Sequence, residues 1–302
     1  MKLQHLEAFV MVARVGSVKD AATELGCSQP SVTKQIRELE KTLGQELLDR
    51  SGRGVRLTPV GILFAGRARE ILNLSRRTVE EFSMLHGEIG GHIVIGTVES
   101  AAVADISQAI KSLRDNHPGV SVTLRRIRRE TVLERLSSGL LSFAITPDAW
   151  DLAGYERLAL PTRDRWGILV PASSPLAAQE SVTLEELEGV PLICPDDSVG
   201  HRQLATWLDD HGEQCQVIYD VVYNAPQLVD AGVGYAVVND CSAGRCSHLG
   251  LMFIPLAPAT SAGMSLVWDP ARALTRVELA FLEAARGVCA QQPGLETDFY
   301  TI

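Results

Sequence analysis

Polar and basic side chains recur along one side of the segment between residues 28 and 43. At about 100° per residue, four of them share a helical face: Pro30, Lys34, Arg37 and Lys41. The opposite face is an apolar stripe, predicted to be buried: Val32, Ile36, Leu39 and Leu43. An amide such as Gln29 can form two hydrogen bonds with an adenine edge, and Lys34 or Arg37 can bond guanine or a phosphate. The pattern predicts a helix that binds nucleic acid, and the alternative is a charged face that meets only solvent.

The residues before this helix are suited to holding it in place. Ser17 lies three residues before Asp20, which resembles the capping box at the start of a short helix. Gly26 supplies a tight turn, Ser28 is a suitable N-cap for the next helix, and Pro30 falls in that helix's first turn. Two amphipathic helices joined in this way predict a helix-turn-helix whose second helix lies in the major groove of DNA.

Two short extended runs follow and flank the sequence Ser-Gly-Arg-Gly at residues 51–54. They predict a β-hairpin wing, in which Arg50 and Arg53 contact phosphates or enter a minor groove. The predicted DNA contacts are therefore Ser28, Gln29, Pro30, Ser31, Thr33, Lys34, Arg37, Arg50 and Arg53.

A long helix is predicted from Pro59 to Ile89, with Thr58 as its cap. Apolar and small residues recur in it at spacings of four and three: Phe64, Ala68, Ile71, Ser75, Thr78, Phe82, Leu85 and Ile89. Such a seam favours a partner helix and hence a homodimer, and the alternative is packing against the helix's own domain. A dimer would present two recognition helices to a pseudo-palindromic site in double-stranded DNA.

The segment Ala8 to Gly61 resembles the DNA-binding head of LysR-type transcriptional regulators. The residues that carry the resemblance are AFVMVARVGSVKDAATELGCSQPSVTKQIRELEKTLGQELLDRSGRGVRLTPVG. The resemblance extends over the whole chain. It implies a two-lobed effector domain like that of periplasmic binding proteins, a small-molecule effector, and a cytoplasmic homotetramer bound at promoters.

Residues 90–302 alternate predicted strands and helices in βαβα order, which is typical of α/β domains with parallel strands. The chain returns through a strand at 264–268 and a final helix at 275–290, which predicts two lobes joined by two crossovers. The expected fold is α/β with three parts: a winged helix-turn-helix at 1–58, a linker helix at 59–89 and an effector-binding domain at 90–302. Within that domain, lobe I covers about 92–161 and 268–302, and lobe II covers about 162–267.

Ligands of open α/β sheets bind at the carboxyl ends of strands, near helix N-termini. Ser100 is a suitable N-cap there, and the neighbouring N–H groups can hold an anion. An arginine cluster at 125–129 would attract an anionic effector, or else pair with acidic residues at the surface. The predicted effector contacts are Ser100, Ala101, Arg128, Arg129, Thr146, His201, Arg202 and Asn224.

Composition narrows the class of protein. Residues 1–89 hold 13 Lys and Arg against 11 Asp and Glu, whereas the remaining residues hold 15 against 26, so a mildly basic head precedes an acidic body. No membrane span or secretory leader is expected. The six cysteines lack paired spacing and are expected to be free thiols, although Cys194 with Cys215, or Cys241 with Cys246, could form a redox pair.

Catalytic chemistry is not indicated. The motifs G-x-S-x-G, G-x-G-x-x-G and the P-loop are absent from any strand-to-helix context, and no His, Asp or Glu cluster has metal-ligand spacing. We therefore expect no catalytic residues, no metal and no cofactor. Two alternatives to a ligand-responsive regulator stay open: an enzyme carrying a DNA-targeting head, and an architectural DNA-binding protein without an effector.

Overall fold

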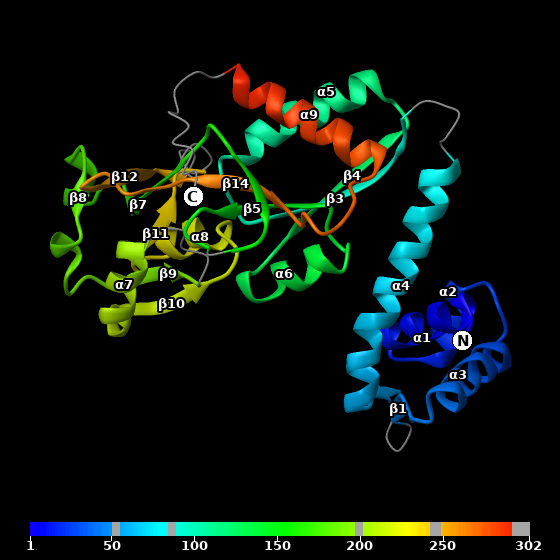
Figure 1. Ribbon diagram of the computed structural model, residues 1–302. Helices are drawn as coiled ribbons and strands as arrows, with labels where there is room; N and C mark the ends of the chain where they lie inside the picture. Colours follow the sequence, from blue (N-terminus) through cyan, green and yellow to red (C-terminus); the bar gives the residue numbers. More distant parts are fainter. Residues whose placement is uncertain (50–54, 84–88, 151, 197–201, 242–248, 292–302) are drawn as a thin grey trace. The chain divides into compact units, whose positions relative to one another are not determined.

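The computed structural model describes residues 1–49, 55–83, 89–150, 152–196, 202–241 and 249–291 (Figure 1). The chain divides into two compact units. The first unit contains Met1–Gly87 and the short segment Ser138–Leu140, and the second contains Glu88–Ser137 and Leu141–Ile302.

The first unit begins with three helices: α1 (Leu3–Val15), α2 (Val18–Glu24) and α3 (Gln29–Leu43). The Ser17 hydroxyl accepts a hydrogen bond from the Asp20 N–H, and the Ser28 hydroxyl accepts one from the Ser31 N–H. Both predicted N-caps are therefore confirmed. Gly26 has a φ of 62° between α2 and α3, a left-handed conformation that glycine adopts without steric cost.

A single apolar core holds these helices together. Val32, Ile36 and Leu39 of α3 are fully buried against Leu6 and Phe9 of α1, so the predicted stripe is confirmed at these three positions. Leu43, at the end of the stripe, is only partly buried.

The predicted wing is confirmed at its base. The antiparallel strands β1 (Leu48–Asp49) and β2 (Arg56–Leu57) follow α3. The tip of the wing, with Arg50 and Arg53, lies outside the described residues.

The linker helix α4 spans Pro59–Ser83 and begins where predicted, because the Thr58 hydroxyl accepts a hydrogen bond of 2.9 Å from the Gly61 N–H. The first half of the predicted seam does not face outward. Phe64, Ala68 and Ile71 pack in the core of the first unit, and the Phe64 ring lies 5.5 Å from that of Phe9. These positions follow the alternative interpretation, and a different set of apolar side chains on α4 is exposed: Val60, Ile62, Leu63, Leu74 and Val79.

The second unit contains two sheets. The sheet of lobe I has the order β4-β3-β5-β14-β6. Its strands are β3 (Gly91–Thr97), β4 (Val120–Arg126), β5 (Phe143–Pro147), β6 (Glu156–Ala159) and β14 (Met264–Trp268). The first three are parallel as expected, whereas β14 is antiparallel to β5 and β6. Because β14 belongs to this sheet, the predicted end of lobe II at residue 267 is wrong, and the chain returns to lobe I before Met264.

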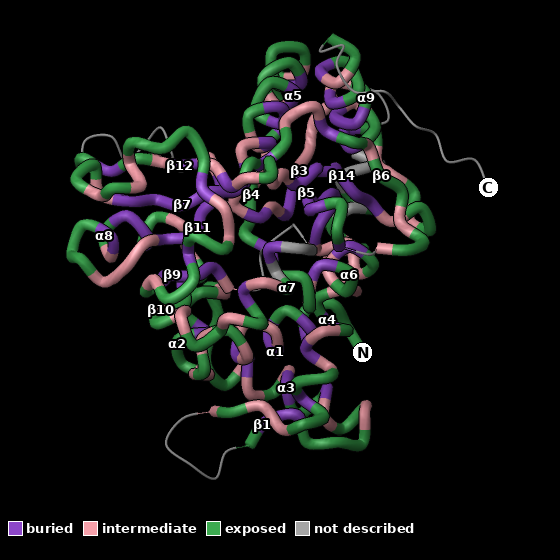
Figure 2. Tube along the Cα trace, turned by 90° about the vertical axis from the view of Figure 1, so that its left-hand side faces the viewer, coloured by how far each residue is buried: buried purple, intermediate pink, exposed green. Residues whose placement is uncertain are grey.

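Three helices cover the two faces of this sheet (Figure 1). They are α5 (Val103–Asn116) and α9 (Arg276–Ala290) on one face and α6 (Arg129–Ser137) on the other. Thr275 and Glu278 form a reciprocal capping box at the start of α9. Buried side chains of all three helices join β5 and β14 in one core, and both of these strands are buried throughout (Figure 2).

The sheet of lobe II has the order β10-β9-β11-β7-β12-β8, and β13 pairs with β7. Its strands are β7 (Asp164–Pro171), β8 (Val182–Thr183), β9 (Leu192–Pro195), β10 (Cys215–Tyr219), β11 (Tyr235–Asn239), β12 (Leu251–Ala257) and β13 (Ser261–Ala262). The helices are α7 (Arg202–Asp210), α8 (Asn224–Asp230) and the 3-10 turns η1 (Pro175–Ala178), η2 (Glu185–Leu187) and η3 (Gly212–Gln214).

Alternate residues of β7 explain how lobe II buries both faces of its sheet. Ile168 and Val170 pack in the same cluster as Leu204 and Leu208 of α7, whereas Leu169 packs in a second cluster that contains α8. A strand that is buried on both faces has a continuous run of apolar residues, and β7 has such a run in Gly-Ile-Leu-Val.

The expectation of free thiols is wrong for two cysteines. Cys194 in β9 and Cys215 at the start of β10 form a disulfide, with Cα atoms 5.6 Å apart. The two strands are parallel neighbours in the sheet, which brings residues separated by 21 positions within bonding reach. Cys27 and Cys289 are free thiols.

Candidate nucleic-acid interface and effector cavity

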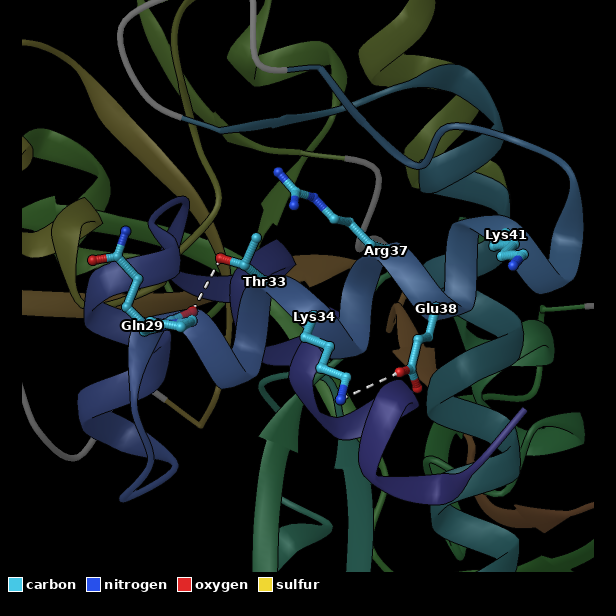
Figure 3. Close-up of a pocket in the computed structure, with 7 residues that line it drawn as sticks. Gln29, Thr33, Lys34, Arg37, Glu38 and Lys41 are labelled. Atoms are coloured by element: carbon cyan, nitrogen blue, oxygen red, sulfur yellow. Dashed lines mark hydrogen bonds and ion pairs between the residues drawn. The ribbon is translucent and has the colours of Figure 1, made fainter.

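One face of α3 carries a continuous row of polar and charged side chains (Figure 3). The row consists of Gln29, Pro30, Thr33, Lys34, Arg37, Glu38 and Lys41. All but Thr33 are exposed, and Thr33 is half-buried; its hydroxyl donates a hydrogen bond of 3.0 Å to the Gln29 carbonyl oxygen. The apolar stripe on the opposite side fixes the rotation of the helix, so this face points away from the core of the first unit.

Ion pairs leave the two ends of the row in different states. Lys34 Nζ lies 4.0 Å from a Glu38 carboxylate oxygen, and the other oxygen of Glu38 lies 3.3 Å from Nε2 of His5 in α1. Among the described residues, Arg37 and Lys41 form no ion pair within 4.0 Å. An exposed guanidinium without a carboxylate partner is available to a phosphate or to the acceptor edge of guanine.

The remaining predicted DNA contacts are distributed unevenly. Ser28 and Ser31 lie at the N-terminal end of α3, where the Ser28 hydroxyl serves as the helix cap. Arg50 and Arg53 lie outside the described residues. Glu38 and Lys41 belong to the same face although neither was predicted as a contact, and their helical spacing from Lys34 was the available signal.

A small cavity lies between the two lobes of the second unit. Its volume is about 20 Å3, which is enough for one or two water molecules. Its walls come from both sheets and both crossovers: Val98, Glu99, Pro147, Asp164, Trp166, Tyr219, Val222, Asn239, Ala262 and Met264.

Hydrogen bonds join the lobes around this cavity. A Glu99 carboxylate oxygen from lobe I accepts one of 2.7 Å from the Val222 N–H of lobe II. The side-chain amide of Asn239 donates to the Glu99 carbonyl oxygen over 2.9 Å. Within lobe II, the Tyr219 hydroxyl donates to the Val237 carbonyl oxygen, and burial together with nearby Cys241 and carboxylates raises the pKa of that phenol.

Asp164 lies at the first crossover and is 4% exposed. Its Oδ1 atom accepts hydrogen bonds from the Ser100 hydroxyl over 2.9 Å and from the Ala101 N–H over 2.8 Å. Burial raises the pKa of the Asp164 carboxyl to about 6, with a smaller contribution from the charge of Asp240, while hydrogen bonds from Ala101, Ser100 and Asn239 act in the opposite direction. A side chain of the protein itself, the Asp164 carboxylate, thus lies where the sequence predicted that an anion binds at Ser100 and Ala101.

The predicted arginine cluster forms ion pairs across the lobes. Arg126 lies 3.0 Å from Asp220 and 3.7 Å from Asp196, and Arg128 lies 3.4 Å from Asp220. Hydrogen bonding from Arg126 lowers the pKa of Asp220. The alternative interpretation, pairing with acidic residues, therefore describes Arg128, and neither arginine lines the cavity.

The other predicted effector contacts are not brought together. Arg129 begins α6 and Asn224 begins α8, and both are exposed. Thr146 is buried in β5. Arg202 begins α7, but its side chain and the whole of His201 lie outside the described residues.

Two family models match almost the whole length of the chain. "Bacterial regulatory helix-turn-helix protein, lysR family" matches residues 3–62, and "LysR substrate binding domain" matches residues 86–290. The chain belongs to the LysR family. It is a DNA-binding transcriptional regulator with an effector-binding domain, and it is not an enzyme.

Individual LysR-family relatives agree with this assignment. HTH-type transcriptional regulator TdcA of Escherichia coli (strain K12) is 29% identical over 237 residues, covering 75% of this chain and 76% of that protein. HTH-type transcriptional regulator TtuA of Agrobacterium vitis is 28% identical and covers 88% of each chain. The crystal structure of CbnR, a LysR family transcriptional regulator, has a TM-score of 0.74 at 20% identity and covers 96% of this chain and 99% of that one, which shows the same fold.

Two absences are shown for the part of the chain that the structure describes. Within it, no helix is long and apolar enough to cross a membrane. The described His, Cys, Asp and Glu side chains also form no group that could hold a metal ion.

Proposed function

We propose that this LysR-family regulator reads DNA through the exposed face of α3, with Gln29 at base edges and Ser28, Ser31, Thr33, Lys34 and Arg37 at bases or phosphates. The observation that carries the proposal is the division of α3 into a fully buried apolar stripe and an exposed polar face. A helix held this way can enter a major groove without exposing its core. Pro30 shapes the first turn, and the predicted contacts of Arg50 and Arg53 remain part of the proposal.

The second part of the proposal is self-association through α4. The exposed residues Leu63 and Leu74 lie about three helical turns apart, so they share a face of the helix. Two copies packed on this face form a homodimer that suits a pseudo-palindromic site, and two dimers form the homotetramer implied by the family resemblance. Because its DNA target is the genome, we place the protein in the cytoplasm.

The third part concerns control. We place the effector between the two lobes, since the cavity there is lined from both sheets and is closed by hydrogen bonds that opening of the lobes would break. A ligand that changes the separation of the lobes shifts the populations of the two states of the regulator. Ser100 and Ala101 act in this cavity through Asp164. For Thr146, Arg129, Asn224, His201 and Arg202, direct contact with the effector remains a prediction.

Selection of duplex DNA from a random pool tests the function. The wild-type protein is expected to enrich a two-fold-related sequence, and Gln29→Ala is expected to relax the preference at one position in each half-site. Ser107→Ala, on the exposed side of α5, serves as the matched control and should enrich the wild-type sequence. Recovery of sequences without any shared motif would contradict specific recognition and would favour the architectural alternative.

A further inference from the structure

The turn that precedes α5 is a built anion site, and a protein carboxylate already fills it. Three donors converge on Asp164. The Ser100 hydroxyl and the Ala101 N–H reach Oδ1 over 2.9 and 2.8 Å, and the Asn239 amide reaches Oδ2 over 3.4 Å. The Ser100 hydroxyl oxygen in turn accepts a hydrogen bond of 3.0 Å from the Ala102 N–H, which fixes its orientation.

The surrounding contacts hold Asp164 in this position. Two residues earlier, the N–H and hydroxyl of Thr162 both donate to the buried Asp105 carboxylate of α5, over 3.1 and 3.0 Å. The crossover is therefore bound to the start of α5 on both sides of residue 163. An external carboxylate could reach the same donors only by displacing a side chain that is covalently tethered and 4% exposed.

The described walls of the cavity beside this turn carry no compensating positive charge. Of its described lining residues, Glu99 and Asp164 are carboxylates and none is Lys, Arg or His. Of the arginines near it, Arg126 pairs with Asp220 and Arg165 pairs with Asp240 over 2.9 Å, and Arg163 donates a hydrogen bond of 3.2 Å to the Ser261 hydroxyl. A second anion would thus be placed next to two carboxylates in a site of low dielectric constant.

We propose that Asp164 is a built-in ligand of the effector domain: it occupies the anion site at Ser100 and Ala101, so the cavity between the lobes selects an effector without negative charge. The inference rests on the proposed effector cavity and replaces the sequence-based expectation of an anionic effector. A buried donor suits such a ligand, since Trp166 lines the cavity and its Nε1–H has no acceptor among the described residues. A neutral or cationic molecule with a carbonyl or hydroxyl acceptor can satisfy that group.

Chemical rescue of an emptied site tests the proposal on the full-length protein. In Asp164→Ala the three donors lose their acceptor, and sodium acetate is expected to take its place. At acetate concentrations about tenfold above its Kd, the unfolding midpoint should rise by about 4 °C relative to sodium chloride at the same ionic strength. Acetamide should give no rise, and wild-type protein should not respond to acetate.

Three matched variants define the site. Asp240→Ala removes a neighbouring carboxylate but leaves the turn filled, so acetate should not stabilise it. Asp164→Asn keeps an acceptor in the turn, so acetate should not raise its unfolding midpoint either. The double variant Ser100→Ala, Asp164→Ala loses one donor and should show at most half of the rescue.

Two results would overturn the proposal. The first is that acetate does not stabilise the Asp164→Ala protein. If that variant folds poorly, the equivalent result is that acetate does not restore its folded yield. The other is a wild-type protein that acetate stabilises as strongly as the variant, since the turn would then accept external anions with Asp164 present. Neither readout involves DNA, so failure here is distinct from loss of sequence selection by α3.

Discussion

The hydroxyl of Ser100 donates a hydrogen bond of 2.9 Å to the carboxylate of Asp164, although 64 residues separate them in the chain. Ser100 belongs to lobe I and Asp164 to the first strand of lobe II. The bond therefore ties the turn before α5 to the crossover between the two lobes. It also explains why a site suited to an anion is closed to one from solution.

Removal of this hydroxyl should weaken the second unit. Ser100→Ala leaves the buried Asp164 carboxylate with one charge-assisted donor fewer, which should lower the free energy of unfolding by about 2 kcal/mol. Urea denaturation measures the change. Ser107→Ala removes an exposed hydroxyl from α5, the helix that follows Ser100, and should cost less than about 0.5 kcal/mol. Equal losses in the two variants would contradict the role of Ser100.

The buried carboxyl of Asp164 predicts a specific pH dependence. Its pKa in the folded protein is about 6, above its ordinary value of 3.8, so the folded state binds the proton more tightly than the unfolded state. This group should therefore add stability as the pH falls from about 6 to 4, by roughly 3 kcal/mol in all, and that contribution is lost as the pH rises through 6.

Asp164→Asn isolates this contribution, because other carboxyls titrate in the same range. The difference in unfolding free energy between wild type and Asp164→Asn should change steeply between pH 4 and 6 and level off above pH 7. Guanidinium titrations at each pH supply the values. A difference that stays constant over this range would show that the Asp164 carboxyl is not perturbed.

The disulfide between Cys194 and Cys215 should be detectable chemically. Alkylation of denatured, unreduced protein should leave these two cysteines unmodified, and Cys27, which is exposed in the folded protein, should react first under native conditions. Closing a loop over a sequence separation of 21 residues predicts a loss of roughly 3 kcal/mol on reduction. Mass spectrometry that finds both thiols alkylated without reductant would contradict the bond.

Charge on the exposed face of α4 should dissociate the dimer. Leu63→Glu and Leu74→Glu together place carboxylates where two apolar surfaces would meet, so the dissociation constant should rise at least about tenfold. Sedimentation of the full-length protein reports it. Leu124→Glu changes an equally apolar, exposed position in β4 and should leave association intact. If Leu124→Glu raised the dissociation constant as much as the double variant on α4, α4 would not be the interface.

Local patterns in the sequence predicted the first unit well. The caps at Ser17, Ser28 and Thr58 and the stripe at Val32, Ile36 and Leu39 depend on residues close in the chain, so spacing alone identifies them. The prediction that the α4 seam packs on a partner helix was wrong for Phe64 and Ala68, which pack in the core of the first unit. A heptad pattern alone does not distinguish packing on another copy from packing on the helix's own domain.

The cavity was harder to predict because its residues converge from distant segments. Strand-end reasoning found Ser100 and Ala101, which are local to one strand and one helix. Asp164, Trp166 and Asn239 reach the same place only through the crossover and the lobe II sheet, and nothing in their spacing marks this. The Cys194–Cys215 pair was missed for a related reason, since β9 and β10 are neighbours only once the sheet has formed.

The measurement that tests the central claim most directly is the DNA affinity of Arg37→Ala as a function of salt concentration, on a duplex selected by the wild-type protein. If α3 lies in the major groove, this variant should bind about tenfold more weakly, and the slope of log affinity against log salt should fall by about one if Arg37 meets a phosphate. Lys111→Ala, an exposed lysine on α5, serves as the control and should match wild type. An Arg37→Ala protein with wild-type affinity and slope would contradict recognition of DNA through this face of α3.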